Sequence, residues 1–430
     1  MNDEFKLMNL KGTQDFLPEE QIIRNKITNT LREVFESYGY LPLETPILCY
    51  YDLLASKYAG GAEILKEVYS LRDQGDRHVG LRYDLTVPFS KVLGINKGLI
   101  LPFKRYEIGK VFRDGPVKLG RAREFYQCDV DACGLESPYA EVEYFTMSKE
   151  VFKKFGIDIE IRYNNRKFLS GILEYSGVKK ENISKFITSV DKLDKQSRED
   201  IEKELIVHTE QSVIDKVFEY FDYSLEELEK ELENTDIEIL KSGLEELSKL
   251  NSLINDLGLD DVCVFTPFLA RGLEIYTGGV WEIFDRSGEF KSALGGGGRY
   301  DDIITKFLNN GEIYPAIGMS FGLEPIFELL KNKSFADVDK YDVYVYEFDN
   351  SKYLFEVSTL LRKAGYKVLT ELNNIKLKKA MNIANRENIK KVIIIGEDEI
   401  KQNSVMLKNM ITGEQELVKM DELVNKIKES

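Results

Sequence analysis

The sequence of 430 residues is poor in cysteine and histidine, and it contains no long apolar run. Its four cysteines fit neither a CxxC metal pattern nor a dense disulfide framework, and its two histidines cannot form a zinc cluster. We therefore predict a reducing compartment, no structural metal and no metal-ligating residues. No stretch long enough to span a bilayer occurs, and the N-terminus lacks the basic-then-apolar layout of a signal peptide. We expect a cytoplasmic protein with no membrane partner.

An excess of positive charge is also missing, because the net charge is −15. This balance argues against a phosphate-binding surface over the whole molecule. The basic residues are concentrated towards the end of the chain: residues 331–430 hold 18 Lys and Arg against 16 Asp and Glu, and residues 362–391 hold nine against two. Any nucleic-acid surface is therefore expected to be local and C-terminal.

The length exceeds what one hydrophobic core usually supports, so two or three domains are expected. Residues 1–330 form the first predicted domain. Within it, residues 170–256 have helical apolar spacing and many acidic residues, which indicates a helical insertion whose simplest interpretation is a solvated subdomain. Residues 341–430 alternate strand and helix patterns, which predicts a small α/β domain with a parallel sheet, closed by a hairpin around Thr412-Gly413 and a last helix. The charged stretch 331–340 is the predicted linker.

Two extended runs, residues 101–113 and 124–134, flank a loop rich in turn-forming residues. They predict a long antiparallel hairpin with a basic tip. Further on, the sequence GGGGRYDDII at residues 295–304 predicts a glycine-rich turn that leads into a helix. In the insertion, Ser224 and Glu227 form the pattern of a capping box.

Three segments rich in arginine, glycine and carboxylates lie at strand ends or turns, where sites are usually built: residues 81–88, 112–131 and 269–278. An arginine at a strand end is more often part of a surface ion pair than a phosphate ligand. It is the joint occurrence of the three segments that indicates a site.

Within the second segment, Arg113, Arg121 and Arg123 are placed so that their guanidinium groups could surround an anion, and such groups suit phosphates. Gln127, Asp129 and Asp131 alternate along the next strand and therefore face one way. They offer acceptors and an amide to a small zwitterion with an ammonium group and an NH-containing ring.

The motifs KGTQDFLP, LRYDLTVPF, GRAREFYQCDVD, SVDKLDK, LARGLEIYTG, GGGGRYD and IIIGEDEI run along nearly the whole chain. On these motifs the chain resembles the histidyl-tRNA synthetases, a family of class II aminoacyl-tRNA synthetases, and within them the eukaryotic-type branch. The combination of RGLEIYTG and GGRYD marks the histidine-specific group, and the arginine-rich hairpin marks class II enzymes in general.

The resemblance implies an α+β catalytic domain, with an antiparallel sheet flanked by helices, that works as a homodimer and is followed by an anticodon-binding α/β domain. The first helix and the strand around Pro46 would form the dimer. The implied activity joins histidine and ATP, with Mg²⁺, into histidyl-adenylate and pyrophosphate, and then transfers the histidyl group to its tRNA.

The resemblance also implies residue roles, carried over onto the matching positions. Arg113 would bind the α-phosphate of ATP, and Arg121 and Arg123 would contact its outer phosphates. Arg271 would neutralise charge between that phosphate and the histidine carboxylate. The remaining histidine contacts fall into two sets, with Asp84, Thr86 and Gln127 on the α-ammonium, and Asp131 and Tyr276 on the imidazole.

For the tRNA, the first candidates are the basic residues on or near one predicted C-terminal helix: Lys376, Lys378, Lys379 and Arg386. The alternative interpretation of this set is an ordinary solvated helix face.

The chain departs from the family at Pro325, where the third motif has an arginine that binds the terminal phosphate of ATP. Glu274 and Ile275 also replace the usual aspartate and tyrosine. These changes leave open an alternative function, a non-charging synthetase-like regulatory subunit of ATP phosphoribosyltransferase in histidine biosynthesis. A third alternative is an RNA-binding sensor that uses only the C-terminal domain.

Overall fold

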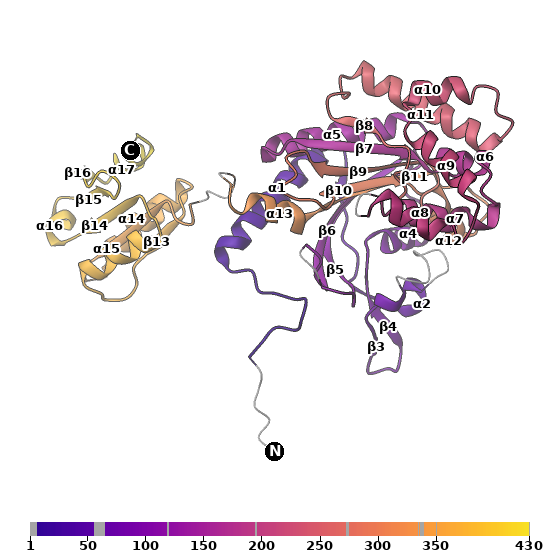
Figure 1. Cartoon of the computed structure of the whole chain (residues 1–430). Coiled ribbons are helices and arrows are strands. Elements are labelled where there is room, and N and C mark those ends of the chain that lie inside the picture. The colour runs from indigo at the N-terminus through magenta and orange to yellow at the C-terminus, as the bar shows by residue number, and fades with distance from the viewer. Residues whose placement is uncertain are drawn as a thin grey trace. The chain divides into compact units, whose positions relative to one another are not determined.

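The computed structural model describes residues 7–55, 65–117, 120–193, 196–271, 275–333, 335, 339–349 and 351–429. The chain divides into two compact units, residues 1–335 and 336–430 (Figure 1). No helix within the described ranges is long and apolar enough to cross a membrane.

The N-terminal unit is built on an eight-stranded sheet in the order β1-β5-β6-β11-β10-β9-β7-β8. The strands are β1 Leu41–Pro42, β5 Phe103–Phe112, β6 Glu124–Cys133, β7 Ile159–Asn165, β8 Cys263–Phe265, β9 Gly279–Asp285, β10 Gly295–Arg299 and β11 Ala316–Gly322. Neighbouring strands are antiparallel except at the two edges, where β1 pairs with β5 and β7 with β8 in parallel. The predicted hairpin of β5 and β6 and the predicted class of fold are both confirmed.

Helices cover both faces of this sheet. On one face lie α1 Pro18–Ser37, α5 Tyr139–Phe155 and α13 Leu323–Leu330, and part of the other face is covered by α4 Thr86–Ile95 and α12 Asp301–Leu308. The side chains of Phe35 and Phe152 pack on Phe321 of β11 at ring-centre distances of 5.6 and 5.9 Å. Because side chains alternate along a strand, Phe321 faces these helices while its neighbour Ser320 faces the opposite side.

A second, small sheet precedes α4 in the sequence. It has the order β2-β4-β3, with β2 Leu48–Tyr50, β3 Ser70–Arg72 and β4 His78–Leu81, and the short helices α2 Tyr51–Leu54 and η1 Leu65–Glu67 accompany it.

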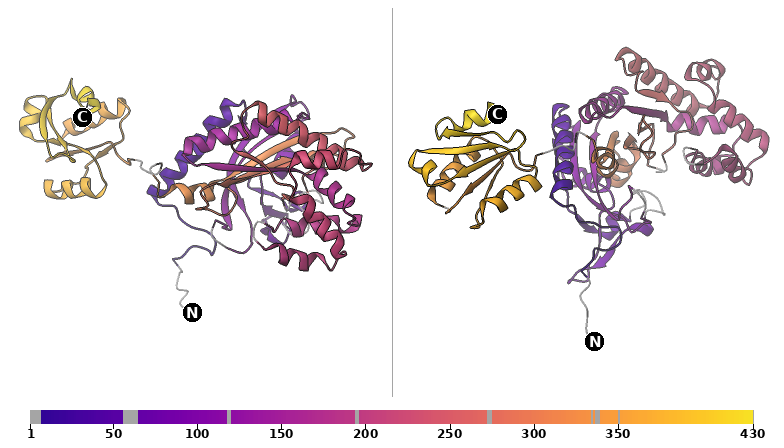
Figure 2. Two further views of the ribbon diagram at one scale, coloured as in Figure 1. Left: turned by 45° about the horizontal axis from the view of Figure 1, so that its top comes forward. Right: turned by 60° about the vertical axis from the view of Figure 1, so that its left-hand side comes forward.

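The helical insertion forms a group of its own on one side of the N-terminal unit (Figure 2). Its helices are α6 Arg166–Tyr175, α7 Lys180–Val190, α8 Arg198–Leu205, α9 Gln211–Phe221, α10 Leu225–Glu231 and α11 Glu238–Asp256. The predicted capping box is present, because Ser224 Oγ accepts the amide of Glu227 and the Glu227 carboxylate accepts the amide of Ser224.

The expected glycine-rich turn at the start of GGGGRYDDII was wrong, because these glycines form the central strand β10. The strand needs glycine because other side chains occupy the space above it and beside it. A Cβ atom added to Gly296 would lie 2.2 Å from Arg271 Nη1, and one added to Gly298 would lie 2.5 Å from the Tyr276 ring. The predicted helix follows as α12.

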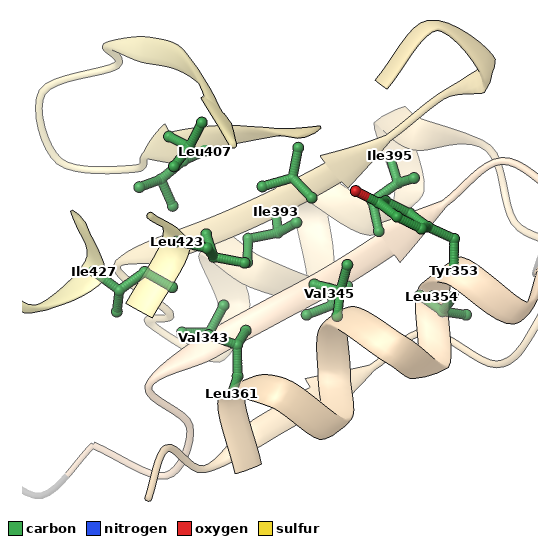
Figure 3. Close-up of a cluster of buried hydrophobic side chains, with 13 residues drawn as sticks. Val343, Val345, Tyr353, Leu354, Leu361, Ile393, Ile395, Leu407, Leu423 and Ile427 are labelled. Carbon is green, nitrogen blue, oxygen red and sulfur yellow. The ribbon is translucent and has the colours of Figure 1, made fainter. Parts of the chain in front are cut away.

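The C-terminal unit has a five-stranded sheet in the order β13-β12-β14-β15-β16. Its elements are β12 Val343–Glu347, α14 Lys352–Lys363, β13 Val368–Thr370, α15 Leu377–Arg386, β14 Lys391–Ile395, α16 Glu397–Lys401, β15 Ser404–Asn409, β16 Gln415–Lys419 and α17 Leu423–Glu429. The predicted strand and helix alternation is present as three parallel strands, and the predicted hairpin, formed by β15 and β16, adds two antiparallel strands to them. Figure 3 shows α14 and α17 packing apolar side chains on one face of this sheet.

Candidate functional site

The centre of the large sheet carries a cavity of about 410 Å³ whose floor is largely backbone. Gly296 of β10 is paired with Ser320 of β11, which is paired with Asp129 of β6. In the next cross-strand row, Gly298 is paired with Gly318, which is paired with Asp131. Glycines on the middle strands let a ligand lie close to the backbone, while the carboxylates of β6 rise along one side.

Seven of the predicted site residues line this cavity, although they come from three distant segments of the chain. They are Asp84, Thr86, Arg113, Gln127, Asp131, Arg271 and Tyr276. The alternation that predicted one common face for Gln127, Asp129 and Asp131 agrees with their position, because all three border the cavity.

Arg113 directly follows β5, and its backbone amide donates to the carbonyl of Arg123 as the hairpin continues. Its Nε donates to the carbonyl of Tyr83 at 3.0 Å, and its guanidinium lies 5.2 Å from the centre of the Phe125 ring. These contacts hold the side chain in the cavity wall. Burial lowers the pKa of Arg113, and the nearby Asp84 carboxylate partly opposes this effect.

Arg271 adopts a left-handed backbone conformation with φ of 49°, which is uncommon for a residue with a side chain. Its Nη1 donates to the carbonyl of Trp281 at 3.2 Å, and its guanidinium lies 5.2 Å from the centre of the Tyr276 ring. A left-handed non-glycine residue costs conformational energy, and such strain is concentrated at functional sites. The next residues, including Glu274, lie outside the described ranges.

Asp84 lies just before α4, and its Oδ1 accepts the backbone amide of Val87 at 3.2 Å. Burial raises its pKa to about 6, although the Val87 amide and the guanidinium of Arg113 both favour the charged form. Asp84 therefore titrates closer to neutrality than an ordinary aspartate does.

Asp131 is buried and is contacted by two residues that the sequence patterns did not single out. Arg105 Nη2 lies 2.8 Å from its Oδ2, and the hydroxyl of Tyr300 donates to its Oδ1 at 2.5 Å. Burial raises the pKa of Asp131, while Arg105 and the Tyr300 hydroxyl lower it. Tyr300 stands within the quoted motif GGGGRYD, but a strand pattern gives no signal for the buried cation Arg105.

Arg121 and Arg123 do not line the cavity. Arg121 Nη2 forms an ion pair with Glu67 at 3.0 Å, and Arg123 Nη2 forms one with Asp114 at 3.1 Å. Both pairs are partly solvent-exposed, so each contributes little stability and its partner can be exchanged. Lys118, which lies between the two strands of the hairpin, is outside the described residues.

Pro325 lines the cavity as the third residue of α13, so the apparent departure from the family lies at the site itself. The preceding Glu324 also lines the cavity, and Arg24 Nη2 lies 2.9 Å from its Oε1. Arg24 is buried and stacks on Phe16 at 3.7 Å.

In the C-terminal unit, the four basic residues predicted for tRNA are exposed on α15 and at its N-cap: Lys376, Lys378, Lys379 and Arg386. Only Arg386 has an ion pair among the described residues, to the adjacent Glu387 at 3.3 Å. The opposite side of α15 is fixed through Ala380 and Ala384, which pack under Tyr344 and Tyr346.

The cavity thus combines two unlike kinds of group. Guanidinium groups of Arg113 and Arg271 can bind and stabilise a phosphate that gains negative charge. Carboxylates, an amide and the Tyr276 hydroxyl suit a cationic, NH-bearing group. The cavity is therefore built to hold an anionic group and a small zwitterion next to each other.

Comparisons with known proteins agree with this chemistry. The family model described as histidyl-tRNA synthetase matches residues 12–326, and the anticodon binding domain model matches residues 342–430. Histidine–tRNA ligase 1 of Bacillus cereus is 43% identical over 424 residues, covering 97% of this chain and 96% of the relative. The crystal structure of histidyl-tRNA synthetase from Nostoc sp. PCC 7120 matches with a TM-score of 0.87 and 27% identity, covering 99% of this chain and all of the other.

One further structure bears on the alternative function. It is described as an ATP phosphoribosyltransferase regulatory subunit/histidyl-tRNA synthetase from Bacillus halodurans, and it matches with a TM-score of 0.77 over 92% of this chain and all of the other. At 19% identity this likeness shows a shared fold alone. The relatives named here are bacterial, so they do not support the expected likeness to the eukaryotic-type branch.

Proposed function

This chain belongs to the histidyl-tRNA synthetase family, and we infer from that membership that it is a histidine–tRNA ligase. In the first step a carboxylate oxygen of histidine attacks the α-phosphorus of ATP, and pyrophosphate leaves with the electron pair of the broken bond. In the second step a hydroxyl of the terminal tRNA ribose attacks the carbonyl carbon, and AMP leaves. The regulatory alternative is not favoured.

One observation carries the mechanism: Arg113 and Arg271 line the same cavity as the carboxylates of Asp84 and Asp131. We propose that Arg113 binds the α-phosphate and that Arg271 lies between this phosphate and the histidine carboxylate. Both groups would stabilise the charge that develops on the phosphoryl oxygens, without reorganising during the reaction. The first step then needs alignment and charge stabilisation rather than a protein base.

For histidine itself, we propose that Asp84, Thr86 and Gln127 contact the ammonium group, and that Tyr276 and Asp131 read the imidazole. The two contacts already made by Asp131, to Arg105 and Tyr300, would fix its carboxylate for this role. A pocket of buried polar groups rejects analogues that leave those groups unpaired.

The outer phosphates of ATP extend, in this proposal, towards Arg121 and Arg123, which would exchange their partners Glu67 and Asp114 for phosphate. We also propose that Glu282 helps to hold magnesium, because it lines the cavity beside Arg271, whose Nε lies 3.9 Å from its Oε1, and carboxylate oxygens are preferred protein ligands of this ion. Bound there with ATP, the ion would neutralise part of the phosphate charge.

We further propose that residues 341–430 bind the tRNA through α15, and that the chain works in the cytoplasm as a homodimer. Exposed apolar side chains around Pro46 support the dimer contact, namely Leu41, Ile47, Leu48 and Tyr50. Analytical ultracentrifugation tests the dimer, since a monomer at micromolar concentration would contradict it.

The ligase activity is tested by histidine-dependent exchange of labelled pyrophosphate into ATP, followed by charging of the histidine tRNA. We expect exchange with histidine and none with the other amino acids. Absence of exchange by the folded full-length protein would overturn the proposed function.

A further inference from the structure

Asp129 is a second buried carboxylate of β6, and its surroundings differ from those of Asp131. It is only 4% exposed and lines the cavity. Its partners are neutral: Gln127 Nε2 lies 3.3 Å from its Oδ1, and the Ser320 side chain forms a hydrogen bond to it. Among the described residues it has no ion-pair partner, whereas Asp131 has Arg105 at 2.8 Å.

A buried carboxylate without a counter-ion is costly, so such groups are normally paired with a cation or coordinate a ligand. Burial raises the pKa of Asp129, and the nearby carboxylates of Asp131 and Asp84 act in the same direction. Arg105 and the Ser320 hydrogen bond oppose this effect without cancelling it. The position of Asp129 in the cavity wall therefore favours a bound cation.

The sheet register places Asp129 relative to Arg271. Asp129, Ser320 and Gly296 are successive cross-strand partners, and Arg271 Nη1 lies above Gly296. Two strand spacings, about 10 Å, therefore separate the Asp129 backbone from the point beneath the guanidinium. An α-amino acid that lies across this row, with its carboxylate towards Arg271, therefore turns its ammonium towards Asp129.

The ring of the amino acid then points towards the next row of the sheet. That row contains Asp131, and Tyr276 lies above its Gly298, with Tyr300 bonded to Asp131. The ammonium end and the ring end of the ligand thus face different carboxylates.

We propose that Asp129 is the counter-ion of the α-ammonium group of histidine, held in place by Gln127 and Ser320. This proposal rests on the proposed function and adds a residue to the contacts given there. The two acids of β6 then have different roles, because Asp129 binds the ammonium through charge, whereas Asp131, already neutralised by Arg105, orients the ring. Asp84 supports the same ammonium from the more exposed side.

The test compares two ligands on two proteins. Histidine and β-imidazolyl-lactate, in which a hydroxyl replaces the ammonium, are titrated calorimetrically into the full-length wild type and into Asp129→Asn, which keeps the size of the side chain. We expect the variant to bind histidine about 10- to 100-fold more weakly, because a charge-assisted contact is lost. Its affinity for imidazolyl-lactate and for ATP is expected to stay within a factor of about three.

Equal weakening of histidine and imidazolyl-lactate, or unchanged histidine binding, would overturn the role of Asp129 while leaving the ligase function intact. The ATP titration detects a variant that folds poorly, because an unfolded cavity no longer binds ATP. In that case Asp129→Ser is titrated with the same two ligands, and selective weakening of histidine binding again supports the proposal. A wild type that does not exchange pyrophosphate would instead remove the proposed function, and this proposal with it.

Discussion

Arg271 lies directly above Gly296, so that a Cβ atom on the glycine would come within 2.2 Å of Arg271 Nη1 and 2.7 Å of the carbonyl of Trp281. The arginine occupies space that any other residue at position 296 would fill. Its left-handed backbone and its hydrogen bond to Trp281 fix the guanidinium over the sheet. Arginine and glycine therefore form one functional unit, although they are far apart in sequence.

The first prediction follows from this geometry. Arg271→Lys should slow pyrophosphate exchange by an order of magnitude or more, because lysine cannot reproduce a planar two-pronged contact and such stabilisation is worth about 3 kcal/mol. Gly296→Ala should slow exchange as well, since the methyl group displaces the arginine. Near-wild-type exchange in Arg271→Lys would remove this residue from the mechanism.

The second prediction concerns specificity. Tyr276→Phe deletes one hydroxyl proposed to bond the imidazole, and a lost buried hydrogen bond costs about 1 to 3 kcal/mol. We expect a higher KM for histidine in the exchange reaction and an unchanged KM for ATP. The assignment fails if both values stay at their wild-type level.

The third prediction is a pH dependence of stability. Burial and the neighbouring acids Asp131 and Asp84 raise the pKa of Asp129 to about 8, from about 4 in an unfolded chain, against the effect of Arg105. Between these values the folded protein holds more protons than the unfolded one, so this group lowers the free energy of unfolding as pH rises from about 4 to about 8. Asp129→Asn removes the effect.

Urea unfolding at a series of pH values should therefore show the free energy of unfolding of Asp129→Asn rising relative to that of the wild type between about pH 4 and about pH 8 and levelling off above. A pKa difference of about 4 corresponds to at most about 5 kcal/mol. Asp131→Asn is the matched control. It removes the nearer of two carboxylate partners of the buried Arg105, at 2.8 Å against 3.8 Å for Glu107, so it should destabilise the protein across the whole range. A constant difference between Asp129→Asn and wild type would contradict the prediction.

Sequence patterns predicted the parts of the site that depend on local structure. Alternation along β6 was enough to place Gln127, Asp129 and Asp131 on one face, and the turn formers defined the β5–β6 hairpin. The glycines of β10 were misassigned because glycine is locally typical of a turn. In this strand, glycine is required because the side chains of Arg271 and Tyr276 occupy the space that a Cβ atom would fill.

The ion-pair partners of buried or loop arginines could not be predicted from the sequence either. Nothing local shows that Arg105, a charged residue in a strand, is buried against Asp131. The basic composition of the hairpin loop also does not show that Arg121 pairs with Glu67 and does not line the cavity. These contacts join residues more than 20 positions apart; the register of the sheet pairs Arg105 with Asp131, and the packing of η1 against the hairpin loop pairs Glu67 with Arg121.

The fourth prediction concerns the C-terminal unit. Replacing the four basic residues of α15 by alanine should weaken tRNA charging while leaving pyrophosphate exchange unchanged, because phosphate contacts supply much of the affinity for nucleic acids. The replaced residues are Lys376, Lys378, Lys379 and Arg386. Charging should be measured at several salt concentrations, since lost phosphate contacts reduce the salt dependence.

A matched control removes the same charge from other basic residues of the same unit: Lys401, Lys408, Lys419 and Lys426. We expect this control to charge tRNA much better than the α15 variant. Equal charging by wild type and the α15 variant would favour a solvated helix face instead.

The last prediction concerns Pro325, which lines the cavity where the family motif has an arginine. With no cation at this position, the terminal phosphate of ATP must be held by others, and Arg121, Arg123 and Lys118 of the hairpin loop are the candidates. Pro325→Arg adds one guanidinium at the phosphate end, where a charge-assisted hydrogen bond is worth about 1.5 to 3 kcal/mol. Because proline is not required in the first turn of a helix, α13 should persist. We expect tighter ATP binding with magnesium present, little change in histidine binding, and no gain in the matched variant Pro325→Ala. If Pro325→Arg binds ATP no better than Pro325→Ala, the phosphate does not reach this position; if neither these variants nor the wild type bind ATP, the ligase function itself is refuted.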